Sequence, residues 1–271
     1  MTDQHSTADV FDDKAAAWAT WQAEPWGRLR YELVAHTLTQ VLPERSGPLR
    51  VIDVGGGDGA DSIPLARAGH QVTIVDHAGE LLKVADTVAA AGGLRASVRT
   101  ICADLDDLEE LQSDGVGVGE AFDVVLCHNV IHYRRDVAGT VQQLVRLLRG
   151  GGIVSVMAPN PAMDVLSAAV RRSDPQAALD VLDAETVHGQ TFDHPMRRVE
   201  AGTVEAALVG VGCQVEHRFG IRCVMDLLVD DDLKRDPDFY GRLARLERVV
   251  CEREPFWRLG RFWQVTARRA S

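Results

Sequence analysis

Val51-Ile-Asp-Val-Gly-Gly-Gly-Asp-Gly59 is the motif from which the fold class can be inferred. An apolar strand runs into the pattern Asp53-x-Gly55-x-Gly57-x-Gly59, and a short helix is expected directly after it. Glycines at such a turn allow positive φ values and leave no Cβ between the main chain and a ligand. A turn of this kind at the carboxyl end of a buried strand is typical of a nucleotide-binding site.

The spacing of the glycines separates two classes of cofactor site. A dinucleotide fingerprint has the form G-x-G-x-x-G, with its third glycine inside the helix. Here the glycines alternate as G-x-G-x-G, which resembles the first motif of the class I S-adenosylmethionine (SAM) methyltransferases. Any tight strand-to-helix turn can look similar. The neighbouring elements are therefore needed to choose between a dinucleotide site and a SAM site.

An acidic residue ends the next predicted strand, which covers residues 70–76. Asp76 follows the glycine turn by about 20 residues, a distance at which a carboxylate accepts hydrogen bonds from both ribose hydroxyls of an adenosine. The alternative role is a cap for the helix predicted over residues 79–91. The glycine turn at the expected distance favours the ribose role.

Polar residues also follow the third and fourth predicted strands. Asp104 comes after the strand at residues 97–103, where the resemblance to SAM enzymes implies a contact to the adenine amino group; it could equally cap a helix over residues 105–111. His128 and His132 follow the fourth strand. Because ligands of open α/β sheets bind at this edge, we expect His128 to line a pocket. For His132, the sequence does not decide between a position in the pocket and one on the surface.

A fifth strand follows a helix at residues 137–148 and an Arg-Gly-Gly-Gly turn, and a strand pair is expected near the C-terminus. The predicted fold is α/β and Rossmann-like: a mostly parallel seven-stranded sheet with helices on both faces and a helical lid insertion. The expected segments are an N-terminal helical cap (1–46), the SAM-binding core (47–158), the insertion (159–198), and a C-terminal part of the core with a substrate-facing segment (199–271).

Composition limits the function classes. No apolar run is long enough for a membrane span, and the polar N-terminus lacks a signal-peptide pattern, so a cytoplasmic protein is expected. Nine scattered histidines show no metal-site spacing, so no metal is predicted. The net charge of −11 means that a nucleic-acid substrate would require a local basic patch. Composition says nothing about the oligomeric state.

Several C-terminal segments are similar to the bacterial tRNA 5-carboxymethoxyuridine methyltransferases. They include residues 220–228 and 259–268, and the N-terminal residues 11–13 and 27–30 fit the same family. The resemblance implies methyl transfer from SAM to a carboxylate on the wobble uridine of tRNA. It also implies SAM contacts from a set of five residues: Arg30, Gly55, Gly56, Asp76 and His128.

Two departures from that family favour a different acceptor. The family carries a lysine-rich run in the insertion, where this chain has Asp180-Val-Leu-Asp-Ala-Glu185. The family's Ala-Gln pair after the third strand is Asp104-Leu105 here, which is closer to SAM enzymes in general. We therefore expect O-methylation of a carboxylate or hydroxyl of a small molecule in a biosynthetic pathway, with tRNA as the alternative acceptor.

The expected chemistry is an in-line displacement that depends on alignment and exclusion of water. A carboxylate acceptor needs an arginine fork and no base, and Arg222 and then Arg198 are the candidates, although each could be a surface ion-pair partner. A hydroxyl acceptor would need a base, for which His128 or His132 could serve. An NAD-type oxidoreductase and a non-catalytic SAM-binding protein remain the alternative function classes.

Overall fold

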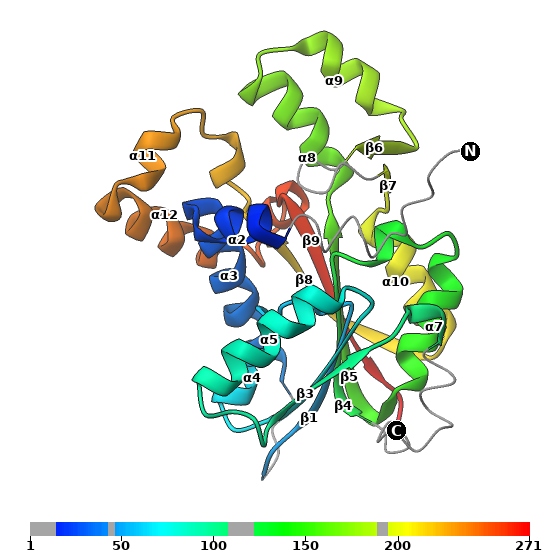
Figure 1. Cartoon of the computed structure of the whole chain (residues 1–271). Coiled ribbons are helices and arrows are strands. Elements are labelled where there is room, and N and C mark those ends of the chain that lie inside the picture. The colour runs from blue at the N-terminus through cyan, green and yellow to red at the C-terminus, as the bar shows by residue number, and fades with distance from the viewer. Residues whose placement is uncertain (1–14, 43–46, 108–121, 189–194) are drawn as a thin grey trace, which may run out of the picture.

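The computed structural model describes residues 15–42, 47–107, 122–188 and 195–271. Its centre is a seven-stranded sheet with the order β3-β2-β1-β4-β5-β9-β8 (Figure 1). Only β9 runs against its neighbours, pairing antiparallel with both β5 and β8. The strands are β1 Arg50–Val54, β2 Gln71–Asp76, β3 Val98–Cys102, β4 Phe122–His128, β5 Leu148–Pro159, β8 Cys213–Ile221 and β9 Phe262–Arg269.

Helices cover both faces of this sheet (Figure 1). One face carries α3, α4, α5 and α12, and the other carries α7 and α10. The helices of the core are α3 Pro25–Val41, α4 Ile63–Arg67, α5 Gly79–Ala91, α7 Val137–Arg146, α10 Ala201–Gly210 and α12 Pro237–Val250. The predicted class I architecture is confirmed.

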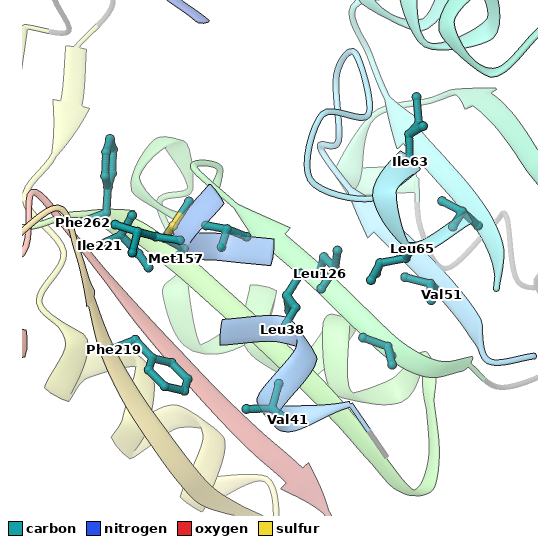
Figure 2. Packing of buried hydrophobic residues seen from close by; sticks show 14 of the residues in the cluster. Leu38, Val41, Val51, Ile63, Leu65, Leu126, Met157, Phe219, Ile221 and Phe262 are labelled. Atoms are coloured by element: carbon teal, nitrogen blue, oxygen red, sulfur yellow. The ribbon is translucent and has the colours of Figure 1, made fainter. Parts of the chain in front are cut away.

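Successive side chains along each strand point to opposite faces of the sheet, and they form the two halves of the core. Val51, Leu126 and Met157 face the cluster that includes α3, whereas their neighbours Ile52 and Val125 face the cluster under α7 and α10. Figure 2 shows the first of these clusters, in which side chains of α3 lie against the middle of the sheet. Central parallel strands are buried on both faces, which explains their nearly continuous apolar sequences.

The insertion, residues 159–198, is not purely helical as predicted. It contains α8 Pro161–Leu166, η3 Ser167–Arg171 and α9 Pro175–Leu182, and then a small antiparallel sheet of β6 Thr186–His188 and β7 Pro195–Arg197. Thr186 and Val187 are β-branched and favour the extended pairing with β7. The insertion stands above the carboxyl edge of the main sheet (Figure 1).

The glycine run at residues 149–152 was predicted as a turn after α7, and this is wrong in detail. Leu148 already pairs with Phe122, and Ile153 pairs with Val124, so the intervening residues bulge out of β5. Gly151 adopts a φ of +74° within this bulge. The glycines therefore serve a strand irregularity, the other common use of backbone freedom at a sheet.

The remaining short elements lie around the carboxyl edge. They are α2 Ala15–Ala23, η1 Leu105–Asp107, η2 Ile131–Tyr133, η4 Met225–Leu227, α11 Asp231–Arg235 and η5 Phe256–Leu259. The helix predicted over residues 105–111 is described only as η1, and its remaining residues lie outside the described ranges. Among the described helices, none is both long and apolar enough to cross a membrane.

Candidate active site

A cavity of about 1060 Å³ lies at the carboxyl edge of the sheet. Its wall comes from the glycine loop (residues 55–58), the ends of β2 and β4, the helices α2 and α3, the insertion, and the segments after β8. Gly59, predicted as a cofactor contact, does not line the cavity, and a Cβ there would meet side chains of Ile63 and Ile74. Single-ligand sites commonly span roughly 300–1,000 Å³. The cavity therefore has room for a nucleotide-sized cofactor and a second small molecule side by side.

The glycine loop is fixed by backbone conformation and by its neighbours. Gly55, Gly57 and Gly59 have φ values of +70°, +51° and +73°. A Cβ at Gly55 would lie 2.3 Å from a methyl carbon of Val130. The Gly55 amide donates to the carbonyl of Val75 at 2.7 Å, which holds the loop against β2.

Asp76 connects this loop to the end of β2. Its Oδ2 accepts the amide of Gly57 at 2.8 Å, and its Oδ1 accepts the amide of Ala78 at 2.8 Å. Burial raises the pKa of Asp76. The carboxylate thus organises two backbone amides and also lines the cavity. The ribose contact stays a prediction.

The residues after β3 form the rim of the cavity beside Asp76. Leu105 is buried and lines it, and Asp104 lines it with an exposed side chain. Oδ1 of Asp104 accepts the amide of Asp106 at 2.9 Å, a local turn contact. Arg134 approaches Asp104 at 3.9 Å and forms a closer ion pair with Asp106. Asp104 therefore has a position open to an adenine amino group and also the local capping contact considered as its alternative role.

Asp61 is a site residue that sequence reasoning missed. Its Oδ1 forms an ion pair with Nη1 of Arg30, and its Oδ2 lies 2.8 Å from Nδ1 of His128. All three side chains are buried and line the cavity. Although burial opposes its ionisation, the Arg30 guanidinium and the His128 hydrogen bond hold the pKa of Asp61 well below its usual range.

A chain of hydrogen bonds continues from His128 into the core. Nε2 of His128 lies 2.9 Å from the Ser155 hydroxyl, and Nε2 of Gln264 donates to the same hydroxyl at 2.9 Å. Oε1 of Gln264 accepts the hydroxyl of Thr37, on α3, at 2.7 Å. Both ring nitrogens of His128 are thereby occupied, so its geometry suits a fixed wall of the pocket better than a general base.

Three buried polar atoms that line the cavity have no hydrogen-bond partner among the described residues: Arg30 Nε, Asp53 Oδ2 and Asn129 Oδ1. Burial, with a smaller contribution from the Asp61 carboxylate, raises the pKa of Asp53 to about 7. Asn129 has a φ of +58°, an uncommon conformation for a residue other than glycine. Such groups indicate a ligand that supplies partners. One N–H donor and two acceptors suit the zwitterionic amino-acid end of SAM.

His132 and Arg222, two candidates for catalysis, both line the cavity. His132 is buried in η2, and its ring lies 4.1 Å from that of Tyr133. Arg222 has a φ of +64°. Its Nε donates to Asp226 at 2.7 Å, Nη2 of the same fork also binds Asp226, and Nη1 donates to the carbonyl of Trp26 at 3.0 Å. One face of the Arg222 fork is therefore already bound to a carboxylate.

Arg198 lies elsewhere. It is not among the cavity-lining residues, and its guanidinium donates to three carbonyls of the insertion: those of Leu182 at 2.9 Å, Ala184 at 3.1 Å and Pro161 at 2.9 Å. The Arg198 guanidinium therefore joins parts of the insertion to one another and lies outside the cavity in which an acceptor would bind.

Five further cationic residues of the cavity wall were not predicted as site residues, among them Arg171 in η3 and Lys234 in α11; the others are Arg134, Arg172 and Arg261. The sequence Asp230-Asp-Asp-Leu-Lys-Arg reads as a solvated helix, so only the rarity of lysine could have singled out Lys234. In the described ranges, no group of three or more His, Cys, Asp or Glu side chains is placed to hold a metal ion.

Comparison with known proteins assigns the class. A family model described as "Methyltransferase domain" matches residues 52–156, which run from β1 through most of β5. The chain belongs to the class I SAM-dependent methyltransferases. It is therefore an enzyme that uses SAM, and the dinucleotide-dependent and non-catalytic alternatives are set aside.

Two methyltransferases of known function are similar to this chain in sequence. The tRNA 5-carboxymethoxyuridine methyltransferase of Escherichia coli (strain K12) is 31% identical over 248 residues, which cover 90% of this chain and 89% of that protein. The ubiquinone biosynthesis O-methyltransferase of Caulobacter sp. (strain K31) is 36% identical over 121 residues, or 45% of each chain. The first likeness spans nearly the whole molecule, and the second covers less than half of it.

Solved structures confirm the fold. A SAM-dependent methyltransferase from Thermotoga maritima, described as a possible histamine N-methyltransferase, superposes with a TM-score of 0.62. The match covers 97% of this chain and 100% of that one at 14% identity. At this identity the likeness concerns architecture alone.

Proposed function

We propose that this methyltransferase transfers the SAM methyl group to an oxygen of a small molecule, and that a carboxylate oxygen is the preferred acceptor. The observation that carries the proposal is the second half of the cavity. Beyond the glycine loop, its wall combines aromatic rings with cations: Trp18, Trp21, Trp26, Phe262, Arg171, Arg222 and Lys234. Such a wall suits a planar, anionic molecule.

The cofactor side of the proposal assigns contacts residue by residue. Gly55, Gly56, Gly57 and Gly59 form the loop that approaches the cofactor. Asp76 receives the ribose hydroxyls, with Asp104 and Leu105 along the adenine. Arg30 and Asp53 receive the amino-acid end, and His128 closes the wall behind it. The orphaned atoms of Arg30 and Asp53 support this placement.

SAM supplies an electrophilic methyl group whose bond to sulfur breaks when a nucleophile attacks from the opposite side. In the proposed reaction a carboxylate oxygen forms the new bond to carbon, and the electron pair of the carbon–sulfur bond remains on sulfur, which gives S-adenosylhomocysteine and a methyl ester. No proton is transferred. The protein aligns the acceptor oxygen with the methyl group and excludes water, and this positioning can account for most of the rate enhancement.

A carboxylate fits better than a hydroxyl because a hydroxyl acceptor calls for a base. Of the two candidate bases, His128 has both ring nitrogens bound, to Asp61 and Ser155, which leaves His132 as the one candidate in the cavity wall. A carboxylate is already ionised at neutral pH and requires orientation only. The segment roles follow the same proposal: a cap at 1–46, a SAM-binding core at 47–158, an insertion at 159–198 that covers the acceptor, and a substrate-facing part at 199–271.

The test is methyl transfer from SAM labelled on its methyl group to a small-molecule extract of the producing organism. We expect label in the small-molecule fraction that mild alkali releases as volatile methanol, because esters hydrolyse under these conditions and methyl ethers do not. The Asp76→Ala variant, which loses the proposed ribose contact, should give no label. Alkali-stable label would indicate a hydroxyl acceptor, and absence of label from this fraction would contradict the proposal.

tRNA is the second candidate acceptor, and the 31% identity across 90% of the chain favours it. The charge of the insertion argues against it: residues 159–198 contain six acidic residues, four arginines and no lysine. Contacts to phosphates require a local excess of Lys and Arg, and binding that depends on them weakens steeply with salt. Tight, salt-sensitive binding of tRNA would support this candidate.

A further inference from the structure

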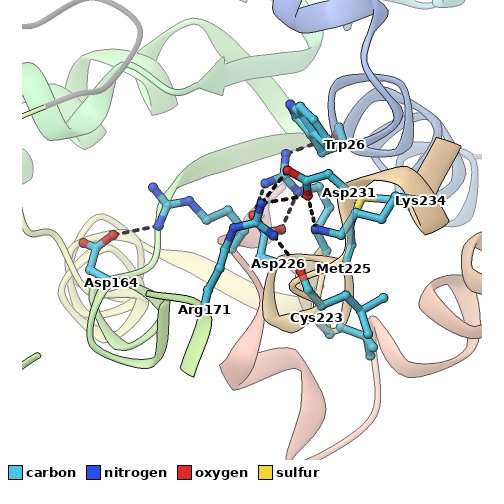
Figure 3. A network of polar contacts seen from close by, with 12 residues as sticks. Trp26, Asp164, Arg171, Cys223, Met225, Asp226, Asp231 and Lys234 are labelled. Carbon is cyan, nitrogen blue, oxygen red and sulfur yellow. Dashed lines mark hydrogen bonds and ion pairs between the residues drawn. The ribbon is translucent and has the colours of Figure 1, made fainter. Parts of the chain in front are cut away.

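Three cations and Asp226 line the cavity beyond β8, which β4, β5 and β9 separate from β1 in the sheet, and Asp231 lies directly behind two of the cations. Figure 3 shows this group, which we name the cation cluster, bridging the insertion, η4 and α11. Its members are Arg171, Arg222, Lys234, Asp226 and Asp231.

The contacts within the cation cluster are specific. Nη2 of Arg171 donates to both oxygens of Asp231, at 2.7 and 2.8 Å, and Nζ of Lys234 donates to Oδ1 of the same carboxylate at 2.9 Å. Asp226 is bound by the fork of Arg222. Two carboxylates thus serve three cations, which leaves one uncompensated positive charge.

The uncompensated positive charge matters most at Lys234, because this side chain is buried. Its side chain is 2% exposed, and burial lowers its pKa. An ammonium group carries three N–H donors, yet among the described residues Oδ1 of Asp231 is the one hydrogen-bond acceptor of Nζ. Trp26 lies beneath the group, with its ring centroid 5.9 Å from Nζ. A buried ammonium with so few partners is costly unless an anion completes its shell.

We propose that the cation cluster is the anion site of the acceptor, in which the carboxylate of a small aromatic or otherwise planar acid docks on Lys234 and Arg171, with its planar body against Trp21 and Trp26. This inference rests on the proposed function and specifies its substrate class. Lys234 is then a specificity-determining residue. Because Arg171 belongs to the insertion and Lys234 to α11, the bound acid also joins these two segments.

The observations select the ligand class. A single surplus charge matches a carboxylate monoanion better than a phosphate dianion. Because the Lys234 side chain is 2% exposed and lines the cavity, only a group that enters the cavity can contact its Nζ, which favours a small molecule over the phosphates on the surface of a folded RNA. Aromatic rings beside the cations provide surface for a flat apolar body: Trp21 and Phe262 lie 5.8 and 5.6 Å from the Arg222 guanidinium.

The test measures binding of three probes to the full-length protein saturated with S-adenosylhomocysteine: benzoate, its neutral amide benzamide, and phenyl phosphate. We expect benzoate to bind about tenfold more tightly than benzamide, the difference of one good charge-assisted contact. Lys234→Met should lower benzoate affinity about tenfold and leave benzamide unchanged. Arg171→Met, as a second variant, should lower benzoate affinity in the same direction.

Lys83→Met is the matched control, because Lys83 is exposed on α5 and pairs with Glu80 away from the cavity. It should bind all three probes as the wild type does. The affinity for S-adenosylhomocysteine reports in every variant that the fold and the cofactor site are intact. Since the comparison of acid with amide uses the wild type, loss of one variant to misfolding leaves the test decisive.

Four results would overturn the inference: equal binding of benzoate and benzamide, unchanged benzoate affinity in Lys234→Met, tighter binding of phenyl phosphate, or no binding of any probe. The proposed function fails differently. Benzoate binding that depends on Lys234, with no methyl transfer to any small molecule, would remove the proposed function and leave the anion site. Methyl transfer to a carboxylate with benzoate affinity unchanged in Lys234→Met would do the reverse: it would leave the proposed function and remove the anion site.

Discussion

At the scale of single residues, Asp61 holds the cofactor half of the site together. It binds the guanidinium of Arg30 with one oxygen and the ring of His128 with the other, and all three side chains are buried. Two groups that face the proposed amino-acid end of SAM therefore share one anchor. Removing one partner of a buried ion pair is costly, because it leaves the other charge uncompensated.

Asp61→Asn should accordingly lower the free energy of unfolding by about 3 kcal/mol and weaken SAM binding by about tenfold or more, since Arg30 and His128 lose their common anchor. Urea unfolding and calorimetric titration with SAM measure the two effects. Asp86→Asn, which removes an exposed carboxylate bound to Thr100, is the control and should change neither. An Asp61→Asn protein with wild-type affinity for SAM would refute the anchoring role.

Asp53 makes stability depend on pH. Its pKa in the folded protein, about 7, lies above the ordinary value, so the folded state holds the proton more tightly than the unfolded chain. This contribution to stability is complete below the unfolded pKa and is lost as the pH rises through about 7. Asp53→Asn removes the dependence, so its Tm relative to the wild type should rise between pH 5 and pH 8, by an amount equivalent to on the order of 3 kcal/mol. A constant difference across this range would contradict the assignment.

At the scale of elements, the glycine loop is the part that tolerates least change. Gly55→Ala would combine a positive φ with a Cβ 2.3 Å from Val130. We expect loss of measurable SAM binding by titration. Gly69→Ala is the control: Gly69 also has a positive φ, +95°, but a Cβ there meets nothing within 4 Å. It should cost about 1 kcal/mol of stability and keep its SAM affinity. Equal loss in both variants would show that backbone strain, rather than crowding of the loop, governs binding.

The insertion offers a second element-scale prediction. Arg198→Met removes donors to three carbonyls of the insertion, so limited proteolysis should cleave this region several times faster while SAM affinity stays within about twofold. Arg197→Met, at an exposed position of β7, should be cleaved at the wild-type rate. If Arg198→Met abolished acceptor methylation without a change in proteolysis, Arg198 would belong to the acceptor site after all.

Sequence patterns predicted the elements that periodicity and glycine spacing define. Helix α5 was predicted at its observed bounds, and the mostly parallel seven-stranded sheet of the class I fold was predicted from the motif at residues 51–59 and the elements after it. The β6–β7 pair and the partners of Asp61 were not predicted. Both depend on contacts between segments far apart in the chain, which no local pattern records. For the same reason, Arg222 could be selected as an arginine fork while its partner Asp226 was overlooked.

At the scale of the whole molecule, charge and shape point to a small acceptor. The protein carries a net charge of −11, and its insertion has an acidic excess, yet the cation cluster in the cavity has one surplus positive charge. An excess of positive charge is thus present at an interior site of an acidic protein. This distribution suits recognition of a small anion and provides little surface for the phosphate backbone of an RNA.

This distribution predicts weak binding of tRNA. At physiological salt, we expect filter binding of bulk tRNA to be no tighter than the nonspecific range of roughly 10⁻⁴–10⁻⁶ M. Arg171→Met should not alter it, because Arg171 acts inside the cavity. Nanomolar binding that Arg171→Met abolishes would mean that the cavity admits a nucleotide of the RNA.

A competition between the two acceptors in one reaction shows which of them this enzyme methylates. The wild-type protein is given SAM with a labelled methyl group together with both acceptors, the organism's small-molecule extract and tRNA carrying the unmethylated wobble carboxylate, and the label in each fraction is measured before and after mild alkali. We expect the label to enter the small-molecule fraction and alkali to release it. Label confined to the tRNA would contradict it.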